Sequence, residues 1–134
     1  MGIRMTIRTL GDSRSDPESG VILCIDDEAT GLLVRKMLLQ SQGYQVLTAL
    51  SGPEGIDLCA TNPVQAVVLD YAMPGMNGAE VAAELKRLYP NIKILLLSAY
   101  VDLPEDALLN VDKRTIKGIS PTDLLADLKQ LLSC

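Results

Sequence analysis

Short apolar runs alternate along the chain with helix-like segments, and this alternation constrains the fold more than any other feature of the sequence. Apolar runs without alternating polar positions are typical of strands buried on both faces, as in a parallel sheet covered by helices. The five expected strands are Val21–Ile25, Gln45–Leu50, Ala66–Leu69, Ile92–Leu97 and Arg114–Ile116. The sequence therefore predicts an α/β fold with a parallel sheet.

Capping side chains mark the starts of the helices that follow the later strands. Each capping residue is followed, three positions later, by an acidic residue that favours the first helical turn. The four pairs are Ser51 with Glu54, Asn77 with Glu80, Asp102 with Glu105, and Ser120 with Asp123. Because each pair follows an expected strand within a few residues, strands and helices alternate as a parallel sheet requires.

The chain has the size and apolar content of one globular domain. Its 134 residues are 48% hydrophobic, which is enough for a substantial core. Residues 1–19 mix Arg, Asp, Ser, Gly and Pro without sustained periodicity. We therefore expect a flexible N-terminal leader over 1–19 and the folded domain over 20–134.

Composition argues against several classes of function. The formal net charge of −5 argues against direct nucleic-acid binding, because phosphate contacts need clustered Lys and Arg. No stretch approaches the roughly 20 apolar residues of a membrane span, and residues 1–20 lack the apolar core of a secretory signal, so we expect no membrane contact and a cytoplasmic location. The chain contains no histidine, which excludes Ser-His-Asp catalysis and His-ligated zinc. Cys24, Cys59 and Cys134 lack metal-ligand spacing, and we expect reduced thiols.

Chemically active residues stand directly after four of the five expected strands. They are Asp26 and Asp27 after the first strand, Asp70 after the third, Ser98 after the fourth and Lys117 after the fifth. Open parallel sheets bind ligands at the carboxyl ends of their strands, where the strand order reverses. With the strand order 2-1-3-4-5, the three carboxylates, the hydroxyl and the ammonium would converge there.

Three carboxylates that lie close together repel one another unless one is protonated or a cation lies between them. A hard divalent ion such as Mg²⁺, or Mn²⁺ in its place, resolves this repulsion because it prefers oxygen ligands. The same ion would align an incoming phosphoryl group with a carboxylate nucleophile. Ser98 and Lys117 would then hold the remaining phosphoryl oxygens. The residue set thus favours metal-dependent phosphoryl transfer.

Four segments resemble the motifs of response-regulator receiver domains, the CheY-like domains of two-component signalling systems. They are Ile25-Asp26-Asp27-Glu28, Leu69-Asp70-Tyr71-Ala72-Met73-Pro74-Gly75-Met76-Asn77-Gly78, Leu97-Ser98-Ala99 and Ile116-Lys117. The similarity covers about residues 20 to 133, and the loop after Asp70 is its most specific element. The resemblance implies a flavodoxin-like, doubly wound, five-stranded parallel sheet of order 2-1-3-4-5 with helices on both faces.

The resemblance also implies a separate role for each acidic residue. Asp70 would accept the phosphoryl group from a sensor histidine kinase or a histidine phosphotransfer protein. Asp27 and Asp70 would ligate Mg²⁺ directly, and Asp26 would act mainly through a bound water. The backbone carbonyl of Ala72 would complete the protein ligands.

Around the phosphoryl group, the resemblance implies contacts from Ser98 and Lys117, while the small side chain of Ala99 would leave access to it. The domain would be a signalling phosphoacceptor that catalyses its own phosphorylation and dephosphorylation, not an enzyme acting on a separate substrate. No output module follows residue 133 in this sequence. We therefore expect either output through contact with a downstream protein target or a chain that is one piece of a longer protein.

The second half of the chain departs from the receiver pattern. The aromatic residue usual three positions before the lysine is Arg114, and the proline usual after the lysine is Gly118. Without the aromatic residue, we expect no phosphorylation-driven dimer through the face that receivers form there. The segment from Ser98 to Lys117 is also shorter than usual, so the helix expected over 102–110 should be stunted.

Three other functions fit parts of the sequence. An aspartate-nucleophile phosphatase of similar fold would carry a second acid two residues after the nucleophile, where this chain has Ala72. A pseudo-receiver that only binds partners is compatible with Arg114 and the short helix, but the intact acidic set disfavours it. A flavin carrier of the same topology is disfavoured because acids, not a Ser/Thr-rich phosphate loop, follow the first strand.

Overall fold

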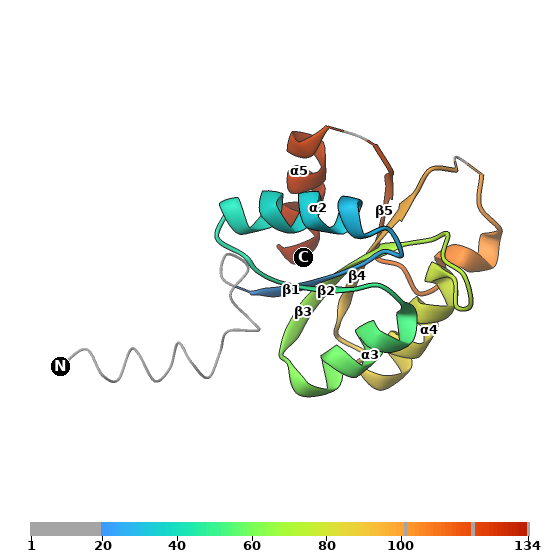
Figure 1. The fold of residues 1–134 in the computed structure, drawn as a ribbon. Coiled ribbons are helices and arrows are strands. Elements are labelled where there is room, and N and C mark those ends of the chain that lie inside the picture. Colours follow the sequence, from blue (N-terminus) through green and yellow to red (C-terminus); the bar gives the residue numbers. More distant parts are fainter. Residues whose placement is uncertain (1–19, 101, 119, 134) are drawn as a thin grey trace.

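The computed structural model of the protein describes residues 20–100, 102–118 and 120–133. Within these ranges, five parallel strands form one sheet of order β2-β1-β3-β4-β5 (Figure 1). The strands are β1 Val21–Ile25, β2 Gln45–Ala49, β3 Val64–Asp70, β4 Lys93–Ser98 and β5 Lys113–Ile116. This confirms the predicted fold class and strand order, whereas the predicted leader over 1–19 lies outside the described residues.

Helices cover both faces of the sheet, as predicted. Helices α2 (Ala29–Ser41) and α5 (Pro121–Leu132) pack on one face, and α3 (Gly52–Thr61) and α4 (Gly78–Leu88) on the other (Figure 1). Successive strand residues point to opposite faces. The central strands are therefore buried on both faces, while the edge strands β2 and β5 are partly exposed. The buried residues include Ile22, Cys24, Val68 and Leu95 on the α2 side and Leu23, Ile25, Leu69 and Leu96 on the α3 side.

Three of the four predicted capping pairs start helices. The side chain of Ser51 accepts a hydrogen bond from the backbone N–H of Glu54, and Ser120 caps α5 in the same way. Asn77 and Glu80 form a reciprocal capping box, with bonds of 3.0 and 2.9 Å. These caps fix the points at which the chain leaves the ligand-binding edge of the sheet.

The predicted helix start at Asp102 is wrong. Among the residues described between β4 and β5, which omit residue 101, there is one 3-10 turn, η2 (Glu105–Leu108), and it begins after Pro104 without a side-chain cap. Proline disfavours helical geometry in the residue before it, through a clash that involves the Cβ of that residue. Leu103 carries a Cβ, unlike Gly52, which precedes Pro53 in the first turn of α3. The expectation of a stunted helix in this segment is confirmed.

The strand limits differ from the predicted ones by one or two residues. Asp70 and Ser98 were expected directly after their strands, but they are the last residues of β3 and β4. Both side chains are therefore held by paired backbone, which fixes their direction more firmly than a loop would.

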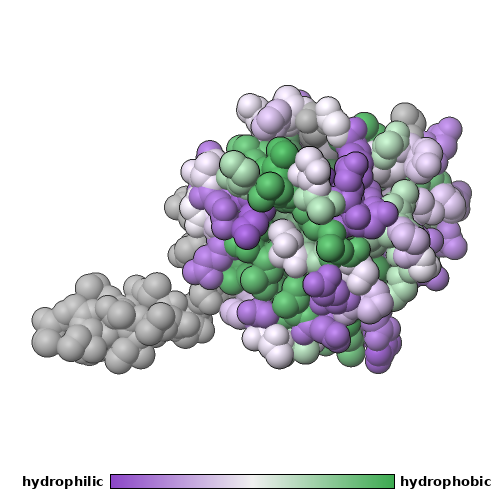
Figure 2. All heavy atoms as spheres, viewed as in Figure 1, coloured by the Kyte–Doolittle hydropathy of each residue, from purple (hydrophilic) through white to green (hydrophobic). Residues whose placement is uncertain are grey.

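The surface mixes apolar and polar side chains (Figure 2). The exposed large apolar residues include Leu33, Val34 and Met37 of α2, each more than half exposed. Cys24 and Cys59 are both buried, and Cys24 is a free thiol as expected, whereas Cys134 lies outside the described residues. Burial raises the pKa of the Cys24 thiol to about 12, so this thiol stays protonated near neutral pH. Within the described ranges, each helix is too short or too polar to cross a bilayer.

Gly78, the first residue of α4, brings that helix against the end of β3. A Cβ at this position would lie 2.7 Å from the carbonyl oxygen of Asp70 and 2.8 Å from Cα of Tyr71. Because the obstacle is backbone, Gly78→Ala should lower the free energy of unfolding by roughly 1–3 kcal/mol, as overpacking does. Urea denaturation followed by circular dichroism measures this change.

Gly31 offers the matched control, since it also lies in a helix and an added Cβ would mainly meet the flexible end of Glu28, at 3.2 Å. Gly31→Ala should raise the free energy of unfolding by up to about 1 kcal/mol, because alanine is the better helix former. Equal effects of the two substitutions would contradict the close approach of α4 to β3.

Candidate functional site

Asp26, Asp27 and Asp70 meet at the carboxyl ends of β1 and β3. Each offers a carboxylate oxygen, and these oxygens all lie within 4.8 Å of one another. The two strands are parallel neighbours, with Ile25 paired with Leu69, so the residues at their ends are brought side by side. Asp26 is 0% and Asp70 3% exposed, whereas Asp27 is exposed to solvent. The predicted convergence of the three carboxylates is confirmed.

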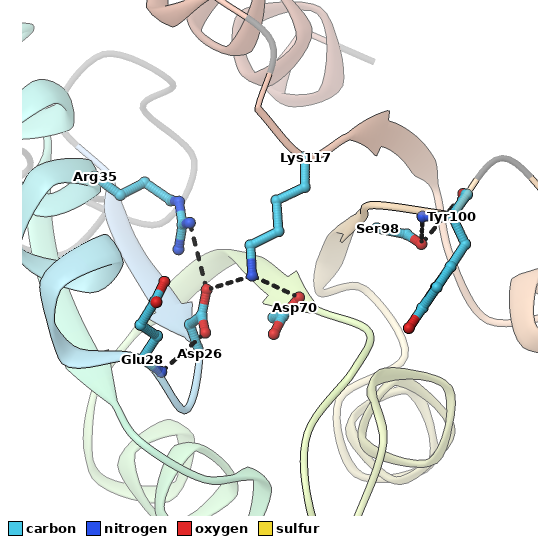
Figure 3. Close-up of polar contacts among 7 residues, drawn as sticks. All are labelled: Asp26, Glu28, Arg35, Asp70, Ser98, Tyr100 and Lys117. Carbon is cyan, nitrogen blue, oxygen red and sulfur yellow. Dashed lines mark hydrogen bonds and ion pairs between the residues drawn. The ribbon is translucent and has the colours of Figure 1, made fainter.

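Lys117 follows β5 and reaches back across the end of the sheet. Its Nζ lies 3.2 Å from Oδ2 of Asp26 and 3.2 Å from Oδ1 of Asp70 (Figure 3). Its backbone N–H donates to the carbonyl of Ser98, which ties the residue to the end of β4. Gly118 has φ of +92°, a conformation closed to the proline usual there. Lys117 thus bridges two carboxylates that would otherwise repel each other.

The charges of this cluster shift one another. Burial and the nearby Asp26 carboxylate raise the pKa of Asp70, and Lys117 only partly offsets them. Burial also acts to raise the pKa of Asp26, but the Glu28 backbone N–H, Lys117 and Arg35 outweigh it and hold that pKa below its ordinary value. Burial acts to lower the pKa of Lys117, but its two carboxylate partners raise it overall. Asp26 is therefore the firmly ionised member, and Asp70 needs further positive charge to ionise as readily.

Ser98 lies at the same end of the sheet, but its hydroxyl does not point into the carboxylate cluster. Its Oγ accepts a hydrogen bond of 2.9 Å from the backbone N–H of Tyr100 and points away from Asp70 (Figure 3). The side chain is buried, with 1% of the residue exposed. The structure therefore places Ser98 next to the site without bringing it into contact with Asp70.

A cavity of about 450 Å³ opens above the carboxylates. It is lined by Asp27, Glu28, Asp70, Ala72, Ala99, Tyr100 and Lys117. The small side chains of Ala72 and Ala99 leave room beside Asp70, as the sequence predicted for Ala99. A larger cavity of about 600 Å³ lies near Tyr89 and Lys93, but no carboxylate lines it. The smaller cavity is therefore the candidate site.

Two arginines take part that sequence reasoning did not place here. Nη2 of Arg35, from α2, lies 3.4 Å from Oδ2 of Asp26 (Figure 3). Arg35 stands three residues after Leu32 and four before Leu39, both buried, and a cation in an apolar helical stripe was the signal available for it. Arg114 donates from Nη2 to the carbonyl of Tyr100 at 2.7 Å, a contact that no sequence pattern indicated.

Comparison with known sequences identifies a family. The family model described as "Response regulator receiver domain" matches residues 22–128. The response regulator SaeR of Staphylococcus aureus is 31% identical over 115 residues, which are 84% of this chain and 50% of that protein. The chain spans half or less of the length of the first curated relatives that it matches, from 19% to 50%.

Solved structures share the fold over most of the chain. The response regulator TrrA of Thermotoga maritima, crystallised with Mg²⁺ and BeF, is 33% identical with a TM-score of 0.79, over 84% of this chain and 98% of that chain. TrrA in complex with the histidine kinase ThkA is 32% identical with a TM-score of 0.77, over the same 84% and 98%. Together with the family model, the sheet order and the carboxylate cluster, these likenesses establish that the chain belongs to the response-regulator receiver domains, the CheY-like modules of two-component signalling.

Proposed function

We propose that this receiver domain, over residues 20–134, takes a phosphoryl group onto Asp70 from a phosphohistidine of a sensor histidine kinase or a histidine phosphotransfer protein. The observation that carries the proposal is the meeting of three carboxylates with Lys117 in an open cavity. The crystallised complexes of TrrA with a histidine kinase and with Mg²⁺ and BeF support the choice of partner and of cation.

The donor set suits a divalent cation, Mg²⁺ or Mn²⁺. Mg²⁺ takes one or two carboxylates and keeps several waters, and exposed Asp27 leaves room for those waters. We assign direct ligation to Asp27, Asp70 and the Ala72 carbonyl, with Asp26 acting through water. Both oxygens of Asp26 already accept contacts from Glu28, Arg35 or Lys117, which suits the indirect role. The cation would offset charge on the phosphoryl oxygens.

In the reaction, a carboxylate oxygen of Asp70 attacks phosphorus as the phosphorus–nitrogen bond to the donor histidine breaks. The departing imidazole takes a proton, and an acyl phosphate remains on Asp70. Lys117 lies within 3.2 Å of the nucleophile and would hold one phosphoryl oxygen. Its positive charge also partly offsets the rise that burial and Asp26 cause in the pKa of Asp70.

Ser98 would contact the phosphoryl group after rotation about its Cα–Cβ bond. That rotation exchanges the hydrogen bond that the hydroxyl donates to the Tyr100 carbonyl for one donated to a phosphoryl oxygen, and it gives up the bond accepted from the Tyr100 N–H. Ala99 and Ala72 are small and line the cavity, so the incoming group meets no bulky side chain there. The phosphorylated domain then signals by contact with a downstream protein, in the cytoplasm and without direct contact with nucleic acid or membrane.

Replacing the acceptor should abolish phosphorylation. Wild-type protein treated with acetyl phosphate and Mg²⁺ should gain one phosphoryl group by intact mass, and Asp70→Asn should gain none because the amide is not a nucleophile. Asp57→Asn is the matched control, since Asp57 is exposed on α3, away from the cluster, and should label normally. Persistent labelling of Asp70→Asn would move the acceptor elsewhere, and an unlabelled wild type would favour a protein-binding module without this chemistry.

Removing one ligand should weaken cation binding. Asp27→Asn takes away one of three clustered negative charges, and we expect the Mg²⁺ dissociation constant to rise by about tenfold or more. The chain has no tryptophan to report binding, so calorimetry or NMR is the measurement. Asp57→Asn again serves as the control, and an unchanged affinity in Asp27→Asn would refute the ligand role.

The acyl phosphate should be long-lived. Ala72 offers no polar group to orient a hydrolytic water beside Asp70, and Tyr100 lines the same cavity and shields it. Ala72→Asn should shorten the half-life of the phosphorylated protein by roughly threefold or more, because its amide can position that water. Loss of the added mass over time after donor removal measures this rate. Equal half-lives in the two proteins would show that side-chain polarity at this position does not control hydrolysis.

A further inference from the structure

Asp26 is a fully buried carboxylate with three protein donors. Its Oδ1 accepts the backbone N–H of Glu28 at 3.0 Å, and its Oδ2 lies 3.2 Å from Lys117 and 3.4 Å from Arg35. The two cations come from different elements, Arg35 from α2 and Lys117 from the loop after β5 (Figure 3). Asp26 thus has one cation, Arg35, that it does not share with Asp70.

Lys117 is the shared cation, and phosphorylation would change its partners. It now lies equally far from Asp26 and Asp70, and a phosphoryl group on Asp70 would draw it away from Asp26. A buried carboxylate that loses its only cation is strongly destabilised. With Arg35 in place, Asp26 remains paired while Lys117 moves.

Stability alone does not explain why an arginine occupies this position. The Arg35 side chain is only 11% exposed, and its Nη1 is buried with no hydrogen-bond partner among the described residues. Its surroundings are mainly apolar and include Val34, Leu38 and Leu124. Burying a guanidinium with an unused donor is costly, and the adjacent Lys36 shows that α2 can carry a cation without an ion pair in the described structure.

We propose that Arg35 is a positioning residue that keeps Asp26 paired independently of Lys117. This inference rests on the proposed function and has two consequences for the same site. The three carboxylates with Lys117 carry a formal charge of −2, which Arg35 reduces to −1, so Arg35 weakens the attraction for a divalent cation. Arg35 also frees Lys117 to engage the phosphoryl group, so it speeds transfer once the cation is bound.

Replacing Arg35 by a neutral residue should tighten Mg²⁺ binding but slow phosphorylation. Loss of structure would instead weaken both, so the two causes are easy to separate. Arg35→Gln should bind Mg²⁺ about three- to tenfold more tightly by calorimetry on the unphosphorylated protein. At saturating Mg²⁺, the same variant should be labelled by acetyl phosphate roughly tenfold more slowly, because Lys117 stays on Asp26. Arg35→Met fills the apolar slot and should give the same pair of changes if Arg35→Gln folds poorly.

Three further variants sharpen the test. Lys36→Gln removes a neighbouring charge from the same helix and should match wild type in both measurements, and Arg35→Lys should recover most of both. In an Asp26→Asn background, Arg35→Gln should no longer slow labelling at saturating Mg²⁺, because Lys117 then has no Asp26 carboxylate to stay on. Unchanged or weakened Mg²⁺ binding in both neutral variants, with wild type binding and labelling normally, would overturn the inference alone. A wild type that neither binds Mg²⁺ nor becomes labelled would overturn the proposed function and this inference with it.

Discussion

The site depends on the repulsion among three carboxylates and on the cations that balance it. Parallel pairing of β1 with β3 leaves Asp26, Asp27 and Asp70 no way to separate without breaking the central strands of the sheet. Lys117 follows the edge strand β5 and supplies positive charge. Although the segment between β4 and β5 is short, Lys117 still lies beside the carboxylates. Since two of the carboxylates are buried, solvent screens this cluster weakly, and small changes of charge have large effects.

The packing of the helices supports this arrangement. Strands buried on both faces require helices close on each side, and Gly78 lets α4 begin directly against the Asp70 backbone. Within α3, Gly55 lets the helix pack closely on the side chain of Ile25, the residue before Asp26. Both acidic strand ends are thus held by close helix contacts, which limits how far the carboxylates can relax away from one another.

Much of the site could be predicted because it follows from backbone topology. The residues after strands of a parallel sheet must meet at one edge, so Asp26, Asp70 and Lys117 were placed correctly. The orientation of Ser98 and the contact of Arg35 could not be predicted in this way. The orientation of Ser98 depends on a side-chain rotamer, and the contact of Arg35 depends on how α2 is rotated about its axis relative to the sheet. Tertiary packing decides both. The false helix start at Asp102 came from weighing a capping pattern above the effect of Pro104 on the preceding residue.

The segment after β4 shows how the site can be coupled to the surface although Arg114 stands where receivers usually have an aromatic residue. Tyr100 is held through both of its backbone polar groups: its N–H donates to Oγ of Ser98, and its carbonyl accepts from the Ser98 hydroxyl and from Arg114. Any movement of the Ser98 hydroxyl toward Asp70 gives up both Ser98 bonds and so weakens the hold on the Tyr100 backbone, which Arg114 still contacts. Hydrogen bonds of this kind weaken steeply when their geometry is lost, so a shift of Tyr100 would also weaken its contact with the Arg114 guanidinium. If Asp70 takes a phosphoryl group as proposed, Tyr100 would link the site to Arg114 through its backbone, where receivers usually use the packing of an aromatic side chain.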